Sequence, residues 1–406
     1  MWNCKFKEMI KNRHIYLLQW LLCSILTVLF SACSSGDAGE GTEITHKQAK
    51  LAIYVYAPEQ AAAKRNGAPH RANEGEVDAI IGEGTIDSLQ IWIYESATGN
   101  YVGYFGTKDV TALNEGQGST YQIPVSDDFA RNKPDVNVYV MANVTDDNCG
   151  IDPLDPLDKE TTRTDLLNGA KIANGHFGLE ENVRAVPAGG LPFAGRLTAQ
   201  PVVGDAPTLR IGTLSAVSTV QLTRAVSKLR FVFAKTTGQP TVNITSIKIN
   251  AGMIPNEEYL FQTPASMTYN AEAVELLLDD KGDIADITDI AETADPTQYL
   301  YLGQEAQAYE DLINAAANKQ PNPEVTVNGP VYLRESDKQL AGTITYKIGD
   351  AEPKTVDFAM QQAGDFKRNH TWIVYAYYAG AGKLQVQSLY VKDWSTKEMN
   401  HQVYNW

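Results

Sequence analysis

The chain has 406 residues, 43% of them hydrophobic and 20% charged, which is typical of a globular protein with room for two or three domains. Its formal net charge of −15 argues against a nucleic-acid partner, because nucleic-acid binding requires a basic face. Two of the four cysteines lie in an N-terminal leader, so no disulfide framework can be built, and no Cys/His group has the spacing of a zinc site.

The leader has the order of an export signal. Basic residues come first, a long apolar run follows, and the small residues Ser31 and Ala32 stand directly before Cys33. The run approaches membrane-spanning length, so a retained anchor is the alternative, but the small residues favour a signal peptide over 1–32, cleaved between Ala32 and Cys33. This site resembles the bacterial lipobox, with Phe30 where leucine is commoner. The resemblance implies a lipoprotein acylated on Cys33, with palmitate among its lipids.

Residues 50–56 alternate between apolar and other side chains, as a half-buried strand does. One face of this expected strand carries Leu51, Ile53 and Val55. Residues 86–94 alternate in the same way and predict a second strand.

The segment between these two strands includes residues 64–76, a loop by its Gly, Pro and Asn content. Hairpin connections usually take about 2–5 residues, so this connection is far too long for a simple hairpin. It offers a trypsin-like protease three basic residues, Lys64, Arg65 and Arg71.

The remaining pattern predicts an all-β chain with few short helices. A helix is expected at residues 158–172. Further strands are expected at residues 101–106, 136–145, 208–224, 227–235, 242–251, 329–336, 341–349, 354–362, 371–380 and 383–391. One β-sandwich seldom needs so many strands, so two are expected, divided near residues 205–219.

Catalytic and metal-binding motifs are missing from the sequence. It contains no HExxH, GxSxG or GxxxxGK[ST] pattern. The acidic residues 146–159 lack the ligand spacing of an EF-hand, so a solvated loop is the preferred interpretation there. We therefore expect no enzyme, no metal and no cofactor.

Several stretches taken together resemble the fimbrillins, the pilus subunits of the Bacteroidales. They are "YVMAN" (139–143), "LPFAG" (191–195, expected as a turn, with Phe193 where methionine is commoner), "LTRAVSKLRFVF" (222–233), "RNHTWIVYAYY" (368–378) and the terminal "VYNW". Each motif alone is weak, but their order spans nearly the whole chain.

This resemblance implies two tandem transthyretin-like β-sandwich domains in a fimbrial subunit that supports adhesion at the outer membrane and cell surface. An arginine-specific protease would remove a propeptide, residues 33–71, by cutting between Arg71 and Ala72, with Arg65 as the second choice. The domains would then span 72–217 and 218–406, and no nucleic acid would take part.

The resemblance also implies head-to-tail polymerisation with the same or other fimbrial subunits by strand exchange. The donor would be the tail, about residues 383–406, with Leu384 and Val386 as its alternating apolar side chains. A shaft, tip or anchor position all stay open, and a surface glycan-binding lipoprotein is the rival from another class.

Overall fold

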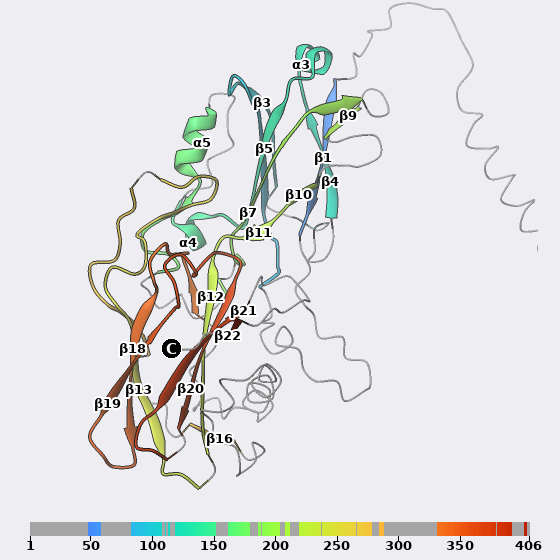
Figure 1. Ribbon diagram of the computed structural model, residues 1–406. Coiled ribbons are helices and arrows are strands. Elements are labelled where there is room, and N and C mark those ends of the chain that lie inside the picture. The colour runs from blue at the N-terminus through green and yellow to red at the C-terminus, as the bar shows by residue number, and fades with distance from the viewer. Residues whose placement is uncertain are drawn as a thin grey trace, which may run out of the picture. The chain divides into compact units, whose positions relative to one another are not determined.

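The computed structural model describes residues 48–57, 83–151, 161–178, 186–277, 284–287, 331–391 and 402–403, with short gaps inside several of these ranges. The chain divides into two units, Met1–Lys47 and Gln48–Trp406, and all described residues belong to the second. Strands dominate this part and its helices are short, so the predicted all-β sandwich class is confirmed (Figure 1).

The first sandwich consists of two sheets that pack face to face. In the first sheet, β1 lies between β4 on one side and β9 and β10 on the other, and β8 extends it beyond β9. The second sheet has the order β11-β7-β5-β2-β3. The strands of the first sheet are β1 (Lys50–Tyr56), β4 (Gly118–Pro124), β8 (Pro201–Val203), β9 (Thr208–Ile211) and β10 (Thr219–Gln221). Those of the second are β2 (Leu89–Glu95), β3 (Tyr101–Thr107), β5 (Val136–Ala142), β7 (Phe193–Ala199) and β11 (Thr223–Arg224).

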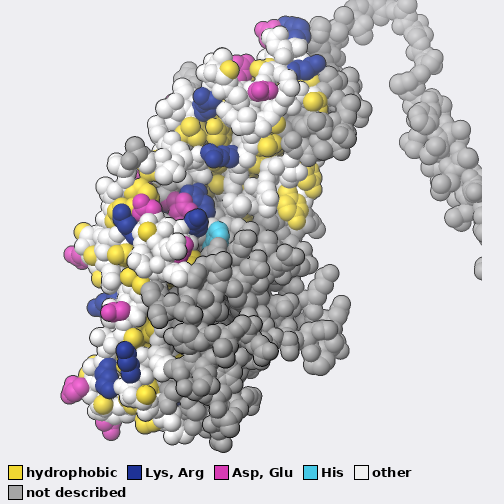
Figure 2. All heavy atoms as spheres, in the orientation of Figure 1, with side chains coloured by type: hydrophobic (Ala, Val, Ile, Leu, Met, Phe, Trp, Pro, Cys, Tyr) yellow, Lys and Arg dark blue, Asp and Glu magenta, His cyan; other side chains and the backbone are white. Residues whose placement is uncertain are grey.

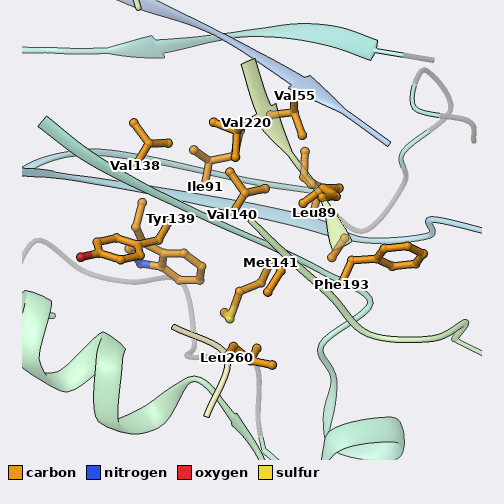
Figure 3. Packing of buried hydrophobic residues seen from close by; sticks show 14 of the residues in the cluster. Val55, Leu89, Ile91, Val138, Tyr139, Val140, Met141, Phe193, Val220 and Leu260 are labelled. Carbon is orange, nitrogen blue, oxygen red and sulfur yellow. The ribbon is translucent and has the colours of Figure 1, made fainter. Parts of the chain in front are cut away.

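Both faces of the second sheet are covered by apolar side chains. Val55 and Val220 meet Ile91 and Val140 between the sheets, whereas Met141 points to the opposite face (Figure 3). That opposite face carries α4 (Asp146–Cys149), α5 (Arg163–Gly169) and a short strand β6 (Lys171–Ile172). The central strands β2 and β5 are therefore buried almost throughout, which explains their nearly continuous apolar sequences.

The second sandwich has its own hydrophobic core. One sheet has the order β16-β12-β20-β21-β22, with β17 also paired to β12, and the other has the order β15-β13-β18-β19. Trp372, Phe366 and Tyr346 are among the large side chains buried between them. The strands are β12 (Ser227–Thr236), β13 (Val242–Ile249), β15 (Val274–Leu277), β16 (Ala285–Ile287), β17 (Val331–Leu333), β18 (Ala341–Ile348), β19 (Lys354–Ala359), β20 (Thr371–Tyr378), β21 (Gln385–Val391) and β22 (Gln402–Val403).

A segment from the second half of the sequence completes the first core. Strand β14 (Glu258–Tyr259) pairs with β6, and the Leu260 amide donates to the Ala170 carbonyl at 2.9 Å. The Phe261 ring then packs 5.0 Å from the Tyr139 ring, centroid to centroid. The second half of the chain therefore contributes side chains to the outer face of the second sheet.

Some predicted elements need correction. The helix expected at 158–172 is only α5, where Thr162 caps Asp165 in a capping box, and residues 171–172 form β6 instead. In the strand expected at 208–224, the described residues form three short strands, and residues 212–218 lie outside the described part. The turn expected at 191–195 is wrong from Phe193 onward, because that residue begins β7. The acidic loop begins with α4, capped by Thr145.

Candidate functional site

Strand β1 is paired on both edges. It runs antiparallel to β4 along its whole length, from Lys50 opposite Pro124 to Tyr56 opposite Gly118. On the other edge its first half is parallel to β9 and its second half is parallel to β10. This strand is therefore an interior member of the sheet, although it comes first among the described residues.

The side chains of β1 follow the predicted alternation. Leu51, Ile53 and Val55 are fully buried in the first core, and the flanking Ala49 and Ala57 lie within the same cluster. The opposite face carries Ala52, Tyr54 and Tyr56, which are half-buried. The expected inward face of residues 50–56 is confirmed.

Among the described strands, β1 is the only partner of β4 and of β10. Strand β10 continues directly into β11, which belongs to the other sheet and pairs with β7. The β4 side instead meets β3 through side chains, with the Phe105 and Tyr121 rings 5.0 Å apart. Strand β1 thus joins parts of the first sheet that otherwise have no backbone pairing to one another in the described structure.

The processing residues predicted from the sequence lie outside the described residues. These are Ala32 and Cys33 at the end of the leader, and Arg65, Arg71 and Ala72 in the segment 58–82. The described part of the chain resumes at Glu83, and this residue makes buried contacts with Lys228 and Tyr332.

Glu83 lies at the centre of a buried polar cluster. Its carboxylate accepts from the Lys228 ammonium at 3.0 Å and from the Tyr332 hydroxyl at 2.5 Å, and the Glu83 and Lys228 side chains have no exposed surface. The Arg224 Nε donates to the Glu83 carbonyl at 3.3 Å. Lys228 belongs to β12 and Tyr332 to β17 of the second sandwich. The sequence analysis did not predict this cluster. It connects the segment before β2 to both β12 and β17.

A second ionic cluster surrounds Glu258 on β14. The Arg368 guanidinium lies 3.1 Å from Glu258 and 2.7 Å from Glu335, and it also donates to the carbonyls of Tyr259 and Leu260. Burial raises the pKa of Glu258 to about 8, although Arg368 opposes the shift. Burial also disfavours the charge of Glu335, but Arg368 outweighs it and lowers the pKa of that carboxyl.

The "RNH" stretch connects the two clusters. Arg368 binds Glu258 and Glu335, whereas the next residue, Asn369, accepts from the Arg224 amide at 3.3 Å and donates its own amide to the Val226 carbonyl at 2.8 Å. Asn369 has φ +58°, a left-handed conformation that asparagine tolerates better than most residues. The motif therefore has a structural role where the chain enters β12.

Two further motif stretches meet at Asn143, the last residue of "YVMAN". This buried side chain donates to the carbonyls of Thr85 at 2.6 Å and Leu191 at 3.0 Å. It accepts from the amides of Asp87 at 2.8 Å and Ser88 at 3.3 Å. Leu191 begins "LPFAG", so one asparagine connects both motifs with the segment that leads into β2.

The predicted donor residues belong to the second core. Leu384 is fully buried, and its amide donates to the Tyr346 hydroxyl at 3.1 Å. Val386 is half-buried against the same core, and β21 is paired to β20 from Gln385 to Val391. Leu384 and Val386 are therefore intramolecular packing residues in this state of the chain.

Within the described part of the chain there is no group of three or more His, Cys, Asp or Glu side chains that could hold a metal ion. None of the helices described there is long and apolar enough to span a membrane. Among the described residues that are coloured in Figure 2, acidic and basic side chains are interspersed.

These features define a class: an all-β protein of two sandwiches, in which the first described strand is interior to its sheet. No protein-family model matches the chain, and no curated protein matches its sequence significantly. Its fold is similar to the crystal structure of a candidate cell adhesion protein from Parabacteroides distasonis, with a TM-score of 0.50 and 13% identity, over 87% of this chain and 99% of that one.

Two further solved structures match at lower scores. A fimbrial assembly protein from Parabacteroides distasonis gives a TM-score of 0.45 and 12% identity, over 87% of this chain and 99% of that one. The tip fimbrial protein Mfa3 from Porphyromonas gingivalis gives a TM-score of 0.45 and 12% identity, over 84% of this chain and 98% of that one. At these identities the similarity concerns the fold.

Proposed function

We propose that this chain is a structural subunit of a cell-surface fimbrium, exported as a lipoprotein, matured by arginine-specific proteolysis and polymerised by strand exchange. The observation that carries the proposal is the position of β1. It is an interior strand that fills the first core with Leu51, Ile53 and Val55, and it is followed by a sequence that carries Arg65 and Arg71. The fold shared with a candidate cell adhesion protein supports the same role.

Loss of β1 would create a driving force for assembly, because it exposes apolar side chains and unpaired strand edges. Each of the three buried aliphatic side chains is worth about 1.5–3 kcal/mol in the core, and β4, β9 and β10 would lose hydrogen-bonded partners. A strand from another subunit would restore both the buried apolar contacts and the backbone hydrogen bonds by β-augmentation. Because donor and acceptor are different surfaces, the contact is head-to-tail and builds an open filament.

The donor in this proposal is the tail from residue 383, with Leu384 and Val386 entering the positions that β1 leaves. Such donation requires β21 to separate from β20 and Leu384 to leave its own core. Two glycines with left-handed backbone, Gly380 at φ +89° and Gly382 at φ +72°, directly precede this segment. They provide a connection that can change direction at little steric cost.

Export and anchoring rest on Cys33. Metabolic labelling with a palmitate analogue should tag the wild type and fail with Cys33→Ala. Equal labelling of the two proteins would contradict the lipoprotein step without affecting the fold.

The maturation step is tested by sequencing the N-terminus of protein shed from expressing cells and by electron microscopy of those cells. We expect a new N-terminus at Ala72 and filaments on the wild type. The double variant Arg65→Ala with Arg71→Ala should leave monomers. The matched control, Lys64→Ala, should assemble normally, because an arginine-specific protease ignores lysine. Filaments of equal abundance on the double variant would refute the proposal.

A further inference from the structure

The two ends of segment 58–82 are attached to the molecule independently. At the first end, the Tyr56 carbonyl accepts from the Leu222 amide at 2.9 Å. At the second end, Glu83 is buried against Lys228 and Tyr332. Cleavage of any peptide bond in this segment therefore leaves the contacts at both ends intact, because none of them depends on the covalent connection between the two ends.

Strand β1 is held strongly without the covalent connection that follows it. It is hydrogen-bonded along both edges, and its start is secured by the Ala49 carbonyl, which accepts from the Val125 amide at 2.9 Å. Its three large side chains have no exposed surface. Spontaneous departure requires the loss of all of these contacts with nothing in their place, so the expected rate of departure is low.

Removal of β1 would also disconnect the sheet. Among the described strands, β4 and β10 pair with no other strand of that sheet, and β9 would keep only β8. The product would be three separate edges around an exposed core instead of a preformed groove. An entering strand must therefore bring these edges back together as it binds, which couples its binding to reordering of the sheet.

We propose that cleavage and loss of β1 are separate events: the nicked chain keeps β1 in place, and β1 leaves only when another strand displaces it. This inference rests on the function proposed above and specifies its regulation. The displacing strand runs in the direction of β1, antiparallel to β4 and parallel to β9 and β10. It carries apolar side chains at alternate positions, directed into the core where Leu51, Ile53 and Val55 now lie.

The test uses the full chain with residues 64–71 replaced by the site of a sequence-specific protease. After cleavage, gel filtration should show the β1 fragment co-eluting with the rest of the chain. The probe is a fluorescent peptide of residues 48–57, which should enter the nicked protein only as the fragment leaves. A control peptide with aspartate in place of Ile53 keeps the length and every other side chain but puts a charge on the inward face, and it should not exchange.

Two aspartate variants separate burial from strand propensity. Ile53→Asp faces the core, and its fragment should leave the nicked chain at least about tenfold faster than the wild-type fragment. Ala52→Asp places the same residue on the opposite face and should be retained. If Ile53→Asp does not fold, the two peptides tested on the wild type still decide the proposal.

Loss of the wild-type fragment at the moment of cleavage would overturn the inference, as would equal exchange of the wild-type and aspartate peptides. Neither readout requires filaments. A nicked protein that retains and exchanges β1 but never polymerises would uphold this inference and contradict the fimbrial function, so the two can fail separately.

Discussion

Glu83 and Lys228 lie 145 residues apart in the sequence and form an ion pair at 3.0 Å in which neither side chain has exposed surface. Water does not screen such a pair, and either charge left alone would pay the full cost of burial. The pair also joins the segment before β2 to β12. It therefore fixes the chain at Glu83, the first described residue after the proposed propeptide.

Removal of one partner of this pair should destabilise the chain strongly. We expect Lys228→Met to lower the free energy of unfolding by about 3–5 kcal/mol, because Glu83 remains buried without its cation. Urea denaturation followed by tryptophan fluorescence measures this change. The control is Arg131→Met, which breaks the exposed pair with Asp128 and should change little. Equal effects of the two substitutions would contradict the role given to Glu83 and Lys228.

Glu258 should make stability depend on pH. Its pKa is about 8 in the folded chain and near 4.5 when exposed, so between these values the folded state holds a proton that the unfolded state has released. This contribution therefore falls as pH rises through that window, by at most about 1.4 kcal/mol per pH unit for one proton. Thermal melts from pH 5 to pH 8 measure the trend.

The contribution of Glu258 is isolated by difference. Glu258→Gln should remove the contribution of one proton to the slope of the free energy of unfolding against pH. The control is Glu257→Gln, next to it in a partly exposed pair with Lys171, which should keep the wild-type slope. A wild-type profile retained in Glu258→Gln would show that another group titrates.

Asn143→Ala should be among the most damaging single substitutions. It leaves two carbonyls and two amides without their side-chain partner and puts alanine at φ +55°. The expected loss is at least about 4 kcal/mol, because four groups lose a partner at about 1–3 kcal/mol each. Asn143→Gly removes the backbone strain and should recover about 1 kcal/mol. The exposed Asn100→Ala serves as control in the same denaturation series, and a loss there as large as at Asn143 would contradict this account.

Leu384→Ala tests the packing of the proposed donor segment. Because this side chain is fully buried, its truncation should cost about 2–5 kcal/mol before any processing occurs. Lys383→Ala, at an exposed neighbouring position, should be close to neutral. A neutral result for Leu384→Ala would mean that the tail is not part of the second core.

Sequence reasoning succeeded where burial is periodic along the chain. Residues 50–56 alternate because one face of β1 meets the core, and β13 and β18 were predicted for the same reason. Strand β4 was missed because Ile123 is its single fully buried residue and the others are polar or small. The helix at 158–172 was overextended because a capping signal fixes where a helix begins but not where a neighbouring strand takes over.

The polar clusters could not have been predicted from local pattern. Glu83 looks like any charged loop residue until Lys228 and Tyr332 are brought to it by the fold. The "RNH" and "YVMAN" stretches were noticed as motifs, but the partners of Asn369 and Asn143 lie far away in the sequence. The order of the sheets determines which of these residues meet, and no short window of sequence contains that order.

The pairing of β1 has a mechanical consequence. Its hydrogen bonds to β4 are perpendicular to the strand axis. A pulling force along that axis therefore loads the whole ladder in shear, so many bonds must yield together, instead of opening one after another like a zipper. Any strand seated in the place of β1 inherits this geometry. Tension along a row of such subunits would then be resisted by entire ladders, while a peeling force at one end of the strand would meet a single bond at a time.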